Sequence, residues 1–133
     1  MESLSLCGHS ILVVEDEPLI ALDLQQSLHK AGAKVLSACT LDRALQLAEH
    51  ARLSAAVLDY GLSAGNCGPV SERLAQRRIP VVIYSGYPDL RQKFPDAVII
   101  PKPAALTDVV DAVSALLRTP FLRRTDRHET DHA

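Results

Sequence analysis

No stretch of this 133-residue sequence approaches the roughly 20 consecutive apolar residues that a membrane-spanning helix requires. The first ten residues also lack a positively charged segment followed by a long apolar one, which is the pattern of a secretory signal peptide. We therefore expect a cytoplasmic protein that does not associate with a membrane.

Cysteine is scarce, with Cys7, Cys39 and Cys67 at wide spacings. An odd number of cysteines so far apart favours neither a disulfide framework nor a metal quartet, so we expect free thiols. Cys67 falls in a polar loop and is expected to be accessible, which leaves a redox role open.

An excess of basic residues is absent as well. Lysine and arginine total 14 against 16 acidic residues, a formal charge of −2, and this balance gives no indication of nucleic-acid binding. The one basic cluster, in residues 118–127, is interrupted by an acid and is interpreted as solvated.

At this length we expect one domain over residues 8–118 and a polar, mobile tail over 119–133, with any output domain on a separate protein.

Short apolar runs alternate with helix signals along the chain, which predicts a parallel sheet with helices on both faces. The expected strands are 11–14, 34–38, 54–58, 81–84 and 98–100. The expected helices begin near residues 18, 40, 69 and 104, and a fourth helix in the Pro-rich stretch 85–102 is predicted to be shortened or missing.

The amphipathic patterns of the first and last helices predict their buried faces. In the first helix the apolar stripe comprises Leu19, Ile20, Leu22, Leu24 and Leu28. In the last helix Val109, Val113 and their neighbours are too many to be buried together, so this face is a candidate for homodimerisation.

Polar residues directly follow four of the five predicted strands. Glu15 and Asp16 follow the first, Asp59 the third, Ser85 the fourth and Lys102 the fifth. Because the carboxyl ends of parallel strands share one edge, we expect these side chains to converge there. Two carboxylates about 4 Å apart repel by roughly 4 kcal/mol at an effective dielectric of about 20, so a cation should bind among them. Oxygen ligands favour Mg²⁺, and such a site suits phosphoryl transfer with Asp59 as the nucleophile.

The ordered set of these motifs resembles the receiver domain of bacterial two-component response regulators. The resemblance covers residues 10–118 and rests on Ile11-Leu12-Val13-Val14-Glu15-Asp16-Glu17, Leu58-Asp59, Ser85-Gly86 and Lys102-Pro103. It implies a flavodoxin-like, doubly wound sheet with strand order 2-1-3-4-5. It also implies that a histidine kinase or histidine phosphotransfer protein phosphorylates the chain.

The resemblance assigns a role to each residue. Asp59 would accept the phosphoryl group, and Asp16, Asp59 and the backbone carbonyl of Gly61 would ligate Mg²⁺, with Glu15 holding metal-bound water. Ser85 would move toward the phosphoryl oxygens and Lys102 would pair with one of them. The Lys102-Pro103 peptide would be cis.

Two features depart from the usual pattern. Ile99 stands where receivers usually have a switch aromatic, three residues before the lysine. Ile83-Tyr84-Ser85-Gly86-Tyr87 is similar to a subgroup of stand-alone receivers whose fourth strand reads Phe-Ala-Thr-Gly-Tyr, so Tyr87 is predicted to share the switch role with Ser85. Gly61 has no side chain to position a hydrolytic water, which predicts slow loss of the phosphoryl group.

Other interpretations remain. The same acids would suit a Mg²⁺-dependent phosphatase of the haloacid-dehalogenase type, although such enzymes place a second acid two residues after the nucleophile and this chain has Gly61 there. A degenerate receiver that acts only as a scaffold is a further alternative.

His128-Glu129-Thr130-Asp131-His132 matches a zinc-protease pattern but lies in the polar tail. Tyr60 could simply pack at the rim.

Overall fold

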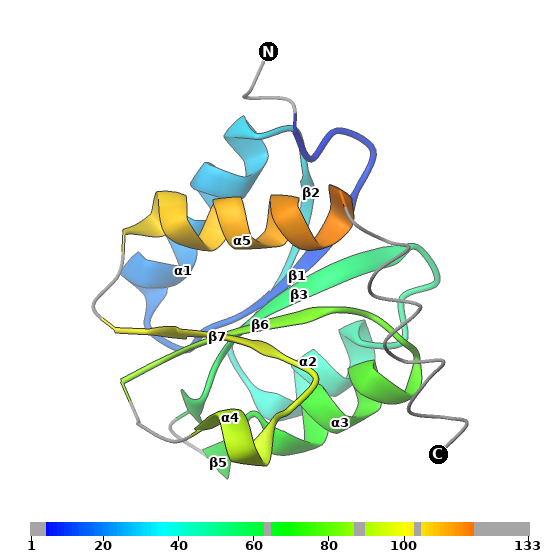
Figure 1. Cartoon of the computed structure of the whole chain (residues 1–133), viewed down its shortest axis with the longest axis vertical. Coiled ribbons are helices and arrows are strands. Elements are labelled where there is room, and N and C mark those ends of the chain that lie inside the picture. The colour runs from blue at the N-terminus through cyan, green and yellow to red at the C-terminus, as the bar shows by residue number, and fades with distance from the viewer. Residues whose placement is uncertain (1–4, 63–64, 87–89, 103–104, 119–133) are drawn as a thin grey trace.

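The computed structural model describes residues 5–62, 65–86, 90–102 and 105–118 (Figure 1). Five parallel strands form the central sheet in the order β2-β1-β3-β6-β7, which confirms the predicted order of the five strands. Their bounds are β1 Ser10–Val14, β2 Lys34–Ala38, β3 Leu53–Asp59, β6 Val81–Ser85 and β7 Val98–Pro101.

Helices cover both faces of this sheet, as Figure 1 shows. One face carries α1 (Pro18–Lys30) and α5 (Leu106–Arg118), and the other carries α2 (Leu41–Leu47), α3 (Gly68–Gln76) and α4 (Leu90–Lys93). The helix α4 has only four residues, which confirms the predicted shortening. The chain is therefore a doubly wound α/β fold with a core on each side of the sheet.

The continuous apolar runs of the central strands follow from this double covering, because a strand buried on both faces has no polar side. Along β1, Ile11 and Val13 pack into the core beneath α1 and α5, whereas Leu12 and Val14 pack into the core with α2 and α3. All four side chains are almost completely buried.

Local capping signals place the ends of two helices. The hydroxyl Oγ1 of Thr40 accepts a hydrogen bond from the Arg43 amide at 3.2 Å and caps α2, whose start was predicted near residue 40. At the end of α1, the amides of Gly32 and Ala33 donate to the carbonyls of His29 and Leu28, which is the Schellman arrangement. Gly32 has φ +101°, the left-handed conformation that glycine adopts most readily at this position.

The predicted apolar stripe of α1 is partly wrong. Leu24 and Leu28 are buried, but Leu19 and Leu22 are 72% and 48% exposed. A helix turns by roughly 100° per residue, and the buried face is set by Leu24, Leu28 and the small residue Ala21. Leu19 and Leu22 project away from that face.

The apolar face of α5 is not buried as a whole, in agreement with the prediction that its residues are too many to be buried together. Val109 and Val113 are fully buried against the sheet, so neither valine can take part in a contact with a second copy. Their neighbours Val110, Leu116 and Leu117 are half-buried and pack against the same core. Homodimerisation through this face stays a prediction.

Sequence patterns missed one small element, a pairing of β4 (Gly61–Leu62) with β5 (Gly65–Asn66) in the loop after Asp59.

No helix in the described part of the chain is both long and apolar enough to cross a membrane. The tail 119–133, with its histidine motif, lies outside the described residues.

We expect Gly32→Ala to destabilise the fold more than Gly8→Ala, by about 1 kcal/mol or more. Both glycines have positive φ, so an alanine is strained at either position. Only at Gly32 would the added Cβ also meet backbone, 2.9 Å from the Cys7 nitrogen, whereas nothing lies within 4 Å at Gly8. Urea unfolding of the two variants measures the difference, and equal losses would contradict the close approach.

Candidate functional site

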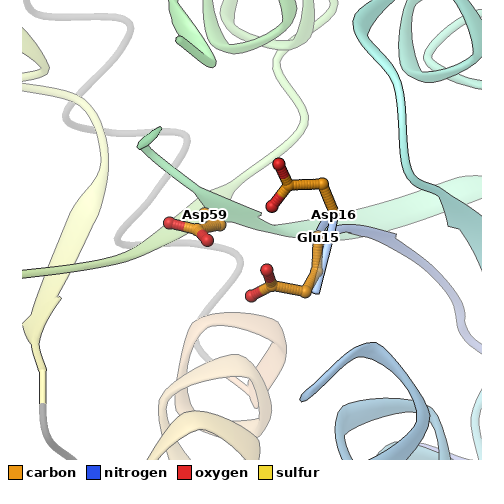
Figure 2. A group of neighbouring side chains, drawn as sticks. All are labelled: Glu15, Asp16 and Asp59. Carbon is orange, nitrogen blue, oxygen red and sulfur yellow. The ribbon is translucent and has the colours of Figure 1, made fainter. Parts of the chain in front are cut away.

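Three acidic side chains meet at the carboxyl edge of the sheet (Figure 2). Asp59 is the last residue of β3, and Glu15 and Asp16 directly follow β1. Because Val14 pairs in register with Leu58, the residues after these two positions emerge side by side. One carboxylate oxygen from each acid lies within 4.8 Å of the other two. The structure thus brings the predicted acids together.

Asp59 is 7% exposed, and each of its oxygens accepts a hydrogen bond. The amide of Gly61 donates to Oδ1 at 3.3 Å, and the Lys102 ammonium lies 3.3 Å from Oδ2. This ion pair joins the central strand to the residue after β7 at the sheet edge. The charge of Lys102 offsets only one of the three neighbouring carboxylates.

Ser85 is the last residue of β6 and is 1% exposed. It follows Tyr84, which pairs in register with Asp59, so Ser85 lies at the same edge as the acids. Its carbonyl accepts a hydrogen bond of 2.7 Å from the Lys102 amide. That bond fixes the backbone from which the lysine side chain reaches Asp59.

Glu15 is the most deeply buried of the acids, at 1% exposed. Its Oε2 accepts the amide of Glu17 at 3.0 Å, but its Oε1 has no hydrogen-bond partner among the described residues. The pKa of this carboxyl is raised to about 7, mainly by burial and also by the adjacent Asp59, against the opposing effects of the Glu17 amide and Lys102.

The donor set fits a hard divalent cation that keeps part of its water. It offers carboxylate oxygens, one of them buried with no hydrogen-bond partner among the residues that the structure describes, and more negative charge than Lys102 neutralises. Mg²⁺ prefers oxygen ligands and holds several waters, so the carboxylates of Asp16 and Asp59 could bind it directly and Glu15 through water. Gly61, the other predicted ligand, lies two residues after Asp59 at the start of β4.

One neighbour of the lysine was not predicted from the sequence. The Lys102 ammonium lies 4.9 Å from the centroid of the Tyr84 ring, over that ring. The only sequence signal was an aromatic residue in an otherwise aliphatic strand, immediately before Ser85. That signal does not specify which way the ring faces or what it contacts.

A second aromatic contact links the residue after Asp59 to the short helix α4. Tyr60 meets Phe94 edge to face with centroids 6.0 Å apart, and Lys93 Nζ lies 3.4 Å from the Tyr60 hydroxyl. Tyr60 therefore packs at the rim, as its interpretation from the sequence proposed.

One expectation about Cys67 is wrong. The thiol is completely buried, because the Cys67 amide donates to the Tyr60 carbonyl and returns the loop to the core at the start of α3. Burial raises the pKa of Cys67 to about 12, which disfavours the reactive thiolate. The other two cysteines are exposed free thiols.

Tyr87 and Pro103, and with them the predicted cis peptide, lie outside the described residues.

Comparison with known proteins gives a consistent result. The profile of the family described as the response regulator receiver domain matches residues 11–114. The chain is 32% identical over 126 residues to the phyllosphere-induced regulator PhyR of Methylorubrum extorquens. That alignment covers 89% of this chain but only 47% of PhyR, so the chain spans about half the length of this relative.

Solved structures have the same fold. A response regulator receiver protein from Sinorhizobium medicae superposes with a TM-score of 0.76 at 26% identity, covering 83% of this chain and 94% of that one. The response regulator TrrA from Thermotoga maritima, solved in complex with Mg²⁺ and BeF, has a TM-score of 0.71 at 22% identity. That match covers 82% of this chain and 99% of TrrA, and at this identity it supports the fold alone.

We expect Glu15→Gln to raise the free energy of unfolding in EDTA at pH 8 by about 1 kcal/mol, because it removes a buried carboxylate that faces other acids. The same substitution should reduce the extra stability that 10 mM Mg²⁺ confers, which follows from binding to the folded state alone. Urea unfolding with and without Mg²⁺ measures both effects.

Glu17→Gln is the matched control, since Glu17 is exposed and its side chain makes no cap hydrogen bond. It should change neither quantity appreciably. A Glu15→Gln protein that is less stable in EDTA, or that Mg²⁺ stabilises as strongly as wild type, would contradict the proposed cation site.

Proposed function

Because the chain belongs to the response regulator receiver family, we propose that Asp59 accepts a phosphoryl group from a histidine kinase or histidine phosphotransfer protein. The observation that carries the proposal is the meeting of Asp59 with two acids and with the Lys102 ammonium at one edge of the sheet. The receiver domain is proposed to cover residues 8–118, which include the matched range 11–114.

The transfer requires a nucleophile and charge neutralisation more than other chemistry from the protein. A bond forms between an Asp59 oxygen and phosphorus as the bond from phosphorus to the donor imidazole breaks. Lys102 then pairs with a phosphoryl oxygen, and the Ser85 hydroxyl, whose residue lies at the same edge, donates to another. Before the reaction Lys102 Nζ already lies 3.3 Å from Asp59 Oδ2, and Ser85 ends the strand that pairs with β3.

Bound Mg²⁺ would supply the positive charge that the phosphoryl oxygens and the acids require together. Asp16 and Asp59 are the proposed direct ligands, with the Gly61 carbonyl as a third and Glu15 acting through water. The buried Oε1 of Glu15, which has no hydrogen-bond partner in the described part of the chain, supports this assignment. The Thermotoga relative TrrA, which was solved with Mg²⁺ and BeF, gives a precedent in the same fold.

Phosphorylation would act as a signal because it adds about −1.5 to −2 of charge at an edge already rich in acids. Movement of Ser85 toward that charge would alter the face formed by β6, β7 and α5, with Tyr87 as the proposed second switch residue. The output is then binding to a separate protein, or removal of phosphoryl groups from the kinase. A true phosphatase is less well supported, because Gly61 stands where that class needs a general acid.

Incubation with Mg²⁺ and acetyl phosphate tests the proposal. We expect intact-mass measurement to find one phosphoryl adduct that hydroxylamine removes and that EDTA prevents. Asp59→Asn should gain none, whereas Asp23→Asn, a change at an exposed acid of α1, should be phosphorylated as wild type. An adduct of equal size on the Asp59→Asn protein would refute the assignment of the acceptor, and steady hydrolysis of a phosphate ester would favour the enzyme.

The lifetime of the adduct depends on the residue at position 61. Because Gly61 carries no group that can orient water, we expect slow hydrolysis of the phosphoryl aspartate, and Gly61→Asn should shorten its half-life several-fold. Loss of the adduct over time by intact mass, after removal of acetyl phosphate, measures this. An unchanged half-life in a folded Gly61→Asn protein would rule out position 61 as its determinant.

A further inference from the structure

The ammonium of Lys102 is held at two points. It lies 3.3 Å from Asp59 Oδ2 and 4.9 Å from the centroid of the Tyr84 ring. We propose that Tyr84 is a positioning residue that holds the Lys102 ammonium beside Asp59 through the face of its ring. This inference rests on the proposed function, because it concerns the reaction at Asp59.

Lys102 needs such support because of its place in the fold. It follows the last residue of β7, which pairs only with β6 and so forms the edge of the sheet. The Lys102 backbone is fixed by its hydrogen bond to the Ser85 carbonyl, but its side chain has a flexible four-carbon stem and is 29% exposed. An attractive carboxylate alone does not fix the direction from which the ammonium approaches.

An aromatic face suits this task better than another acid would. The negative face of the ring attracts a cation without neutralising it and without accepting its hydrogen bonds. The three N–H donors of the ammonium therefore stay available for Asp59 and, after transfer, for phosphoryl oxygens. A further carboxylate at this position would compete for the same donors and add to the repulsion among the acids.

The ring itself is well fixed. Tyr84 is 8% exposed and packs in the core that contains Val109 and Val113 of α5. Its backbone is paired on both sides, in register with Asp59 on β3 and with Ile100 on β7. A rigid aromatic residue thus connects the strand that carries the acceptor to the strand that leads to the lysine.

Three variants separate positioning from packing. Tyr84→Phe keeps the ring, Tyr84→Leu keeps an apolar side chain without one, and Tyr84→Met serves in place of Tyr84→Leu if circular dichroism shows that the latter does not fold. Ile83→Val is the matched control, because Ile83 is the preceding residue of β6, is fully buried and packs into the opposite core.

Two measurements are made on each folded protein. Proton–carbon NMR reports the Lys102 Hε shifts, which should lie upfield of those of the exposed residues Lys30 and Lys34 because a ring face shields nearby protons. Initial phosphorylation rates from acetyl phosphate at saturating Mg²⁺ report the function. Tyr84→Phe and Ile83→Val should retain both properties. Tyr84→Leu should lose the upfield shift and slow phosphorylation by roughly three- to tenfold, the range expected for one cation–π contact.

Three results would overturn the proposal: wild-type Lys102 Hε signals at the position of exposed lysines, a Tyr84→Leu protein phosphorylated at the wild-type rate, or a Tyr84→Phe protein as impaired as Tyr84→Leu. If wild type takes up no phosphoryl group at all, the proposed function fails, and the NMR comparison alone then decides whether the ring holds the lysine.

Discussion

The parallel pairing of β1 with β3 determines the chemistry of this molecule. Their register places Val14 opposite Leu58, so the acids that follow β1 must lie beside the acid that ends β3. Burial of the central strands fixes that arrangement, because a slip of one residue would move each side chain of a strand into the opposite core, where other neighbours are packed. Three carboxylates are therefore held within 4.8 Å of one another by the packing energy of the whole sheet.

The resulting excess of negative charge explains the other features of the site. Lys102 reaches Asp59 from the sheet edge and neutralises part of the charge, while a buried oxygen of Glu15 has no hydrogen-bond donor among the described residues. A divalent cation would satisfy that oxygen and reduce the repulsion. A phosphoryl group would then find cationic groups on more than one side of Asp59. The same charge balance accounts for the proposed need to hold the lysine with an uncharged ring.

Sequence patterns predicted the topology and the main site because both depend on order along the chain. Alternating strands and helices fix which strand ends share an edge, and Glu15, Asp16, Asp59, Ser85 and Lys102 all lie at such ends. Features that depend on side-chain direction were not predictable in this way. The contact of Tyr84 with Lys102 depends on which way a ring faces, and the exposure of Leu22 depends on the rotational phase of α1. Burial of Cys67 depends on a loop that turns back to the core through one hydrogen bond to Tyr60.

A crystal structure of the protein with Mg²⁺ and beryllofluoride would locate the cation and the acceptor in one measurement. We expect the metal between the carboxylates of Asp16 and Asp59, with beryllium bonded to an Asp59 oxygen and a fluoride within hydrogen-bond distance of Lys102 Nζ. Metal bound elsewhere, or beryllofluoride absent from Asp59 while the metal site is filled, would contradict it.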